Sequence, residues 1–143
     1  MKKLFLALVA LVMSCTAYAF EFDGIELNNN AVEVTRQISA RGYIYDTEKD
    51  CLKGNCQGTE IYMSVNYRDT KQKNKIGQLI VDVPMAEPNA MAVVSHMFNV
   101  VYHQISHTSD TYTYQASEDG TTLVVSTIPG GIRLTYNTPY YQK

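Results

Sequence analysis

All three histidines of this chain fall within the stretch HMFNVVYHQISH, residues 96 to 107. Imidazole nitrogens bind zinc and titrate near neutral pH, so a histidine cluster raises the possibilities of metal binding and pH sensing. The apolar spacing around this stretch predicts a helix from Glu87 or Pro88 to Ser106. On that helix the three histidines share one side, opposite the apolar side that carries Val94 and Phe98.

The spacing within the cluster restricts a metal site to two residues. His103 and His107 are i, i+4 neighbours, which suits two ligands on one helix face. His96 is seven residues before His103, about 10 Å along a helix, which is too far for a shared zinc ion. Two ligands do not close a site, and Gln104 stands where an HExxH motif has glutamate. Three interpretations remain: a solvated helix face, a two-histidine metal site at His103 and His107, and a pH-sensing surface.

Cys51 and Cys56 form the second candidate, in the segment CLKGNC. In an oxidising compartment this pair predicts a disulfide that closes a short loop with Gly54 and Asn55 at its turn. Closing so small a loop stabilises a fold by roughly 2 kcal/mol. A redox pair is the alternative, but the spacing is CxxxxC rather than CxxC and no βαβ pattern surrounds it.

Tyrosine is the third feature, with eleven tyrosines and no tryptophan. Tyr43 and Tyr45 are i, i+2 neighbours, as are Tyr112 and Tyr114, so each pair is expected on one face of a sheet. If that face is open, its amphipathic rings suit the binding of a protein or a sugar. The alternative is that these tyrosines fill the core of a β-rich fold.

Motifs of enzymes and nucleic-acid-binding proteins are missing from the sequence. There is no GxSxG, no SxxK and no cysteine in a reactive context, so we expect no enzyme and no cofactor. The formal net charge is −2 and no basic patch is visible, so nucleic acid is not an expected partner.

The first nineteen residues predict an export signal. Lys2 and Lys3 precede an apolar run that is too short for a membrane anchor, and residues 17–19 read Ala-Tyr-Ala, a typical cleavage site. We expect a signal peptide at 1–19 and one exported domain at 20–143, in the periplasm or secreted. The alternative is a lipid anchor on Cys15, within the imperfect lipobox VMSC. No later apolar run is long enough for a transmembrane helix.

The remaining pattern alternates helices and strands. A helix is expected at 31–41, followed by strands at 43–46, 60–69 and 76–84, and the second helix is followed by strands at 111–117, 122–128 and 132–138. This order, α-βββ-α-βββ, predicts an α+β fold with an antiparallel sheet of about six strands and both helices on one face. The two halves suggest a duplication, although no residue-level repeat is visible.

The segments FDGIEL (22–27), ISARGY (38–43) and GIRLTY (131–136) resemble a group of small, exported, uncharacterised proteins of Gram-negative gut bacteria. The order of elements is similar over most of the chain. Unlike that group, this chain has no tryptophan near the second helix, and it has the Cys51 and Cys56 pair. The resemblance implies an exported single domain without an assigned enzymatic activity, and it identifies no catalytic residues.

These observations together predict a non-catalytic binding or interaction domain, with a protein or glycan partner and a surface made of Tyr43, Tyr45, Tyr112 and Tyr114. Two alternatives come from other classes of function. The chain is a metal-binding protein that uses His103 and His107, or it inhibits an exported hydrolase.

Overall fold

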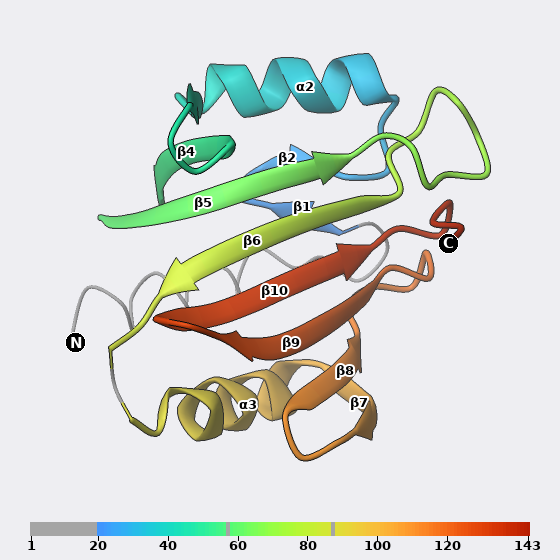
Figure 1. Ribbon diagram of the computed structural model, residues 1–143. Coiled ribbons are helices and arrows are strands. Elements are labelled where there is room, and N and C mark those ends of the chain that lie inside the picture. The colour runs from blue at the N-terminus through green and yellow to red at the C-terminus, as the bar shows by residue number, and fades with distance from the viewer. Residues whose placement is uncertain (1–19, 57, 87) are drawn as a thin grey trace.

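The computed structural model describes residues 20–56, 58–86 and 88–143, and the predicted signal peptide at 1–19 lies outside these residues. The described chain is α+β, as predicted, with two helices, a two-stranded sheet and an eight-stranded antiparallel sheet (Figure 1). The helices are α2 (Ala31–Ala40) and α3 (Ala90–Val101). The strands are β1 (Glu21–Phe22), β2 (Ile25–Glu26), β3 (Ile44–Asp46), β4 (Cys51–Cys56), β5 (Thr59–Asn66), β6 (Gln78–Pro84), β7 (His103–His107), β8 (Thr111–Gln115), β9 (Thr122–Ile128) and β10 (Gly131–Asn137).

Helix α2 begins and ends where its sequence signals predict. The Asn30 side chain accepts a hydrogen bond from the backbone N–H of Glu33, which satisfies a donor that the first turn would leave open. Val34 and Ile38, an i, i+4 pair, are the buried residues of the helix. Gly42 follows the helix with φ +87°, a conformation that glycine adopts without strain.

Helix α3 is shorter than predicted. It ends at Val101, because Tyr102 is extended and its buried ring lies 5.5 Å from that of Phe98. Residues 103–107 then form strand β7, which pairs with β8 along the edge of the sheet. The prediction of a helix up to Ser106 is therefore wrong at its C-terminal end.

The segment predicted to be a disulfide loop is strand β4. Cys51 and Cys56 are its first and last residues, and both are free thiols. Successive side chains of a strand alternate between faces, so residues five positions apart point to opposite sides of the sheet. An extended strand also separates them by about 16 Å, whereas disulfide-bonded Cα atoms are at most about 7 Å apart. The predicted disulfide is thus incompatible with this strand.

The large sheet consists of two four-stranded meanders, with strand order β3-β4-β5-β6-β10-β9-β8-β7. It has two more strands than the six predicted, because β4 is inserted between β3 and β5 and β7 is added at the edge beside β8. Each meander follows one helix, and the last strands, β6 and β10, pair at the centre (Figure 1). Helix, strand order and pairing thus recur in both halves. The predicted duplication gains support from this recurrence.

One core lies between the sheet and a layer made of α2, α3 and the β1–β2 hairpin. Phe20, directly before β1, and Phe22 of β1 are buried, and both rings pack on Tyr136 of β10, with centroids 4.5 and 5.7 Å away. The buried residues of both helices belong to the same hydrophobic cluster as one face of the sheet. Both helices therefore cover that face, as predicted.

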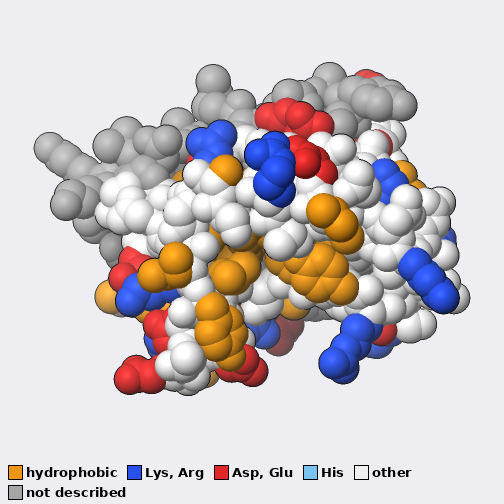
Figure 2. All heavy atoms as spheres, turned by 90° about the horizontal axis from the view of Figure 1, so that it is seen from above, with side chains coloured by type: hydrophobic (Ala, Val, Ile, Leu, Met, Phe, Trp, Pro, Cys, Tyr) orange, Lys and Arg blue, Asp and Glu red, His pale blue; other side chains and the backbone are white. Residues whose placement is uncertain are grey.

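Seen from the α2 side, exposed hydrophobic side chains occur in separate patches among polar and charged groups (Figure 2). No described helix is both long enough and apolar enough to span a bilayer.

Candidate binding surface

Two of the four predicted surface tyrosines are buried. Tyr43 is 4% exposed and donates a hydrogen bond to Asp23 Oδ2 at 3.0 Å. Tyr114 is fully buried and donates to the backbone carbonyl of Ser95 on α3 at 3.3 Å. Burial raises the pKa of Tyr43, and it raises the pKa of Tyr114 to about 12. Both rings belong to the core, so neither is part of a binding surface.

The other two tyrosines do not form a surface of their own. Tyr45 is 58% exposed at the edge strand β3 and donates to Asp50. Tyr112 is half-buried on the core side of β8, where it stacks on Tyr114 with ring centroids 6.4 Å apart. The predicted tyrosine-bearing face is therefore wrong, since core filling explains most of this set.

The two histidines proposed as metal ligands are placed on opposite sides of the sheet. His103 pairs with Gln115 of β8, whereas His107 pairs with Tyr112 and stacks on its ring at 5.6 Å. Positions 112 and 115 face opposite sides, and a bulge between Gln104 and Ser106 produces this change of face in β7. The helical i, i+4 geometry on which the two-histidine site rested is absent. His96 is exposed on α3, apart from both.

The side of the sheet opposite the core is covered by no other described element, and we call it the open face (Figure 1). Its side chains form three rows that run across the strands in register. The charged row is Lys53, Tyr62, Asp82, Arg133, Ser126 and Thr111. The central row is Ser64, Ile80, Thr135, Val124, Thr113 and Ser106. The amide row is Asn66, Gln78, Asn137, Thr122, Gln115 and His103.

The charged row is held by ion pairs and by a tyrosine. Arg133 binds Asp82 through two hydrogen bonds of 2.7 and 3.0 Å, and this pairing raises the pKa of Arg133. The Tyr62 hydroxyl donates to Glu60 at 2.6 Å, which raises the pKa of Tyr62 to about 12. These contacts, with the ion pairs of Lys53 to Asp46 and Glu60, pair the charges of the row, so its charged groups form a fixed border along the open face.

The amide row is a chain of side-chain hydrogen bonds. Asn66 Nδ2 donates to Gln78 Oε1 at 2.9 Å, and Gln78 Nε2 donates to Asn137 Oδ1 at 2.7 Å. The bonds join β5, β6 and β10 at the centre of the sheet. Since each amide orients the next, Asn66, Gln78 and Asn137 form a second fixed border along this part of the row.

Between the two borders the central row is less polar and keeps hydroxyls available. In the described part of the chain, the hydroxyls of Ser64, Thr135 and Thr113 have no hydrogen-bond partner. Ile80 and Val124 separate them and are partly exposed. The central row can therefore offer both hydrogen bonds and apolar contact to a ligand.

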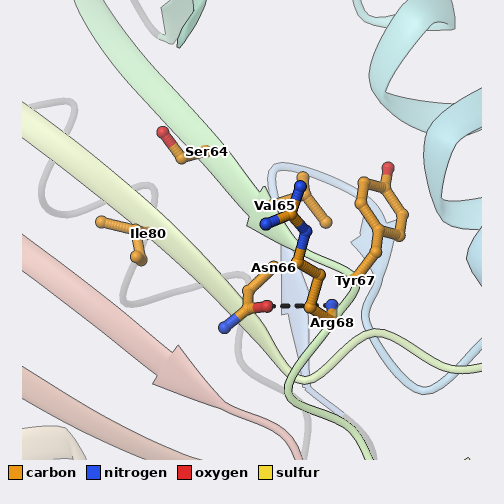
Figure 3. Close-up of a pocket in the computed structure, with 6 residues that line it drawn as sticks. All are labelled: Ser64, Val65, Asn66, Tyr67, Arg68 and Ile80. Carbon is orange, nitrogen blue, oxygen red and sulfur yellow. Dashed lines mark hydrogen bonds between the residues drawn. The ribbon is translucent and has the colours of Figure 1, made fainter.

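A hollow of about 330 Å³ lies where the open face meets the end of β5 (Figure 3). It is lined by residues 64–66 of β5, by Tyr67 and Arg68 directly after that strand, and by Ile80 of β6. Its volume is at the lower end of the range of small-molecule sites, roughly 300–1,000 Å³.

The sequence predicts part of this surface. Alternation in β5 assigns Tyr62, Ser64 and Asn66 to the side opposite the core, where the structure places them. Arg68 resembles any charged residue at a strand end, so nothing in the sequence marks it. The hollow arises only when β5 and β6 pair, since Ile80 comes from the neighbouring strand.

No group of three or more histidine, cysteine, aspartate or glutamate side chains that could hold a metal ion occurs among the described residues. Comparisons with protein-family models, with curated proteins and with solved structures found no match. The resemblance to small exported bacterial proteins and the inhibition of an exported hydrolase both stay predictions.

Proposed function

We propose that this chain is an exported, non-catalytic binding domain whose binding surface is the open face of the eight-stranded sheet. The observation that carries the proposal is the construction of that face. On β5, β6 and β10, hydrogen-bonded polar groups of the charged and amide rows flank a central row with available hydroxyls and partly exposed apolar side chains. Fixed polar groups around a moderately apolar strip are typical of ligand sites, because orientation then costs little on binding.

Export and the absence of catalysis are parts of the same proposal. The sequence of residues 1–19 supports export, and the lack of catalytic motifs supports a binding role. The expected ligand is a glycan, one of the two partner classes that the sequence predicts, and it is expected to contact Ser64, Thr135 and Thr113 through the central row.

The test is a titration of the protein, in its exported form, with maltotriose, chitotriose and trigalacturonate, followed by backbone amide NMR shifts. We expect saturable shifts along the central row. A Thr135→Lys variant places a long charged side chain in the middle of the face and should abolish them. Val32→Lys is the matched control, because Val32 is 81% exposed on α2, away from the open face.

Two results would contradict the proposal. One is a set of shifts that map to the helices rather than to the central row. The other is a Thr135→Lys variant that binds as well as the wild type. No saturable shift with any of the three sugars would contradict sugar binding by this face.

A further inference from the structure

The two halves of the sheet differ most at the loop that forms the hollow. In the second half β9 and β10 are joined by residues 129–130, a tight turn with Gly130 at φ +81°. In the first half the equivalent strands β5 and β6 are joined by residues 67–77. A short turn is sufficient for the hairpin, as the second half demonstrates. The longer loop is therefore an addition that the sheet itself does not require.

Hydrogen bonds to distant segments of the chain hold the added loop in place. The Lys71 N–H donates to the Tyr140 carbonyl at 2.7 Å, and the Gln142 N–H donates to the Asp69 carbonyl at 3.1 Å. Lys75 Nζ donates to the Asn28 carbonyl at 2.6 Å. These contacts reach segments far away in sequence, so the loop holds a defined conformation and positions Arg68 beside β5.

Asn66 fixes the start of the loop. Its Oδ1 accepts hydrogen bonds from the backbone N–H groups of Arg68 and Asp69 at 3.0 and 3.2 Å. Its Nδ2 donates to Asp69 Oδ2 at 2.9 Å and to Gln78. Asn66 thus binds the carboxylate of Asp69, the residue after Arg68. The Asp69 carboxylate does not pair with Arg68.

Arg68 differs in this respect from two other arginines. Arg36 pairs with Glu33, and Arg133 pairs with Asp82. Within the described residues, the Arg68 guanidinium has no ion-pair or hydrogen-bond partner. It lies at the hollow together with the available Ser64 hydroxyl and the apolar Ile80 (Figure 3).

We propose that this hollow binds the carboxylate-bearing sugar unit of an acidic glycan, an inference that rests on the proposed function of the open face. The Arg68 guanidinium is suited to two parallel hydrogen bonds with the sugar carboxylate. The hydroxyls of Ser64 and Thr135 match sugar hydroxyls, and Ile80 packs against the C–H groups of the ring. An acidic peptide fits less well, because it offers a carboxylate to Arg68 but no ring hydroxyls to Ser64 and Thr135.

The test compares trigalacturonate, its methyl ester and a glutamate-rich hexapeptide, each titrated into the exported protein and followed by amide NMR. We expect trigalacturonate to shift the amides of Ser64, Arg68 and Ile80 saturably. The methyl ester lacks the carboxylate charge, so the protein should bind it at least roughly tenfold more weakly than trigalacturonate. Arg68→Gln should reduce trigalacturonate affinity by a similar factor, and Arg68→Lys should restore only part, because lysine lacks the planar fork.

Arg36→Gln is the matched control, since it removes the same charge from α2 and should leave affinity within about twofold. Equal binding of the acid and its ester, unchanged by Arg68→Gln, would overturn the inference but leave the open face as a sugar-binding surface. Binding of the hexapeptide in preference to the sugar would also overturn it. The absence of a saturable shift with trigalacturonate would overturn it as well. In that case the titrations with maltotriose and chitotriose, and the Thr135→Lys variant, would still test the proposed function.

Discussion

The ring of Tyr43 lies over Gly54, so that a Cβ added to Gly54 would come within 2.1 Å of Tyr43 Cδ1. In the second half of the sheet the roles are exchanged. Tyr114 occupies the β8 position that corresponds to Gly54 in β4, and its cross-strand partner in β7 is Gln104. Each half thus fills this part of the core with one tyrosine, which directly precedes the first strand in one case and lies in the second strand in the other.

This exchange predicts the effect of substitutions at both positions. Gly54→Ala forces the Tyr43 ring away and should lower the free energy of unfolding by about 1–3 kcal/mol. The double variant Tyr43→Gln/Gly54→Tyr copies the second half and should be more stable than Gly54→Tyr alone. Urea unfolding midpoints measure both effects. A double variant no more stable than the single one would show that the two halves do not pack equivalently.

The thiols of Cys51 and Cys56 should both be free in the purified protein. Unfolding without a reductant, in the presence of iodoacetamide, should alkylate both residues, as peptide mass spectrometry would detect. In the native state Cys56 should react more slowly than Cys51, because burial raises its pKa to about 11 and leaves little thiolate. A peptide that links the two cysteines under non-reducing conditions would contradict strand β4.

Stability should fall at alkaline pH through Tyr114. Its pKa in the folded state is about 12, mainly because of burial, whereas an unfolded tyrosine titrates near about 10. The neutral form is favoured in the fold, so this contribution is complete below about pH 10 and is lost as the pH rises through about 12. The wild type should lose more stability than Tyr114→Phe between these values. Parallel pH profiles for the two proteins would show that Tyr114 is not the group responsible.

Phe20 should be essential to the core. Phe20→Ala removes a buried ring stacked on Tyr136 and should destabilise the fold by about 3–5 kcal/mol. Val32→Ala, on the exposed side of α2, should change stability by less than about 0.5 kcal/mol. Thermal unfolding of the two variants tests the comparison. Similar melting temperatures would contradict the packing of the β1–β2 hairpin described above.

No zinc site should require both His103 and His107, since they face opposite sides of β7. We expect His103→Ala and His107→Ala to bind zinc with the same weak, millimolar affinity, which is typical of single exposed side chains. A zinc titration followed by imidazole NMR shifts measures this affinity. A loss of affinity of a hundredfold or more in each single variant would show that the two imidazoles share an ion.

Local signals predicted the elements whose pattern agrees with their packing. The alternation of Ile61 and Met63 with Tyr62 and Ser64 identified both faces of β5. The asparagine cap and Gly42 identified the ends of α2. In these places propensity and tertiary structure favour the same conformation.

The failures occur where pairing partners determine the structure. In residues 103–107 only Ile105 fits the apolar helical pattern that precedes them, and these residues pair with the edge of β8 as a strand. The segment at 51–56 contains glycine and asparagine and resembles a turn, yet β3 and β5 pair with it on both sides. Such long-range hydrogen bonds are not encoded in local periodicity.

The packing of the β1–β2 hairpin on β10 also constrains when the chain can fold. During synthesis Phe20 emerges from the ribosome long before Tyr136, its stacking partner. Strand β10 also occupies the centre of the sheet, between β6 and β9. The core therefore cannot close until synthesis has passed Tyr136, and the two meanders, which pair through β6 and β10, cannot join into one sheet before that point.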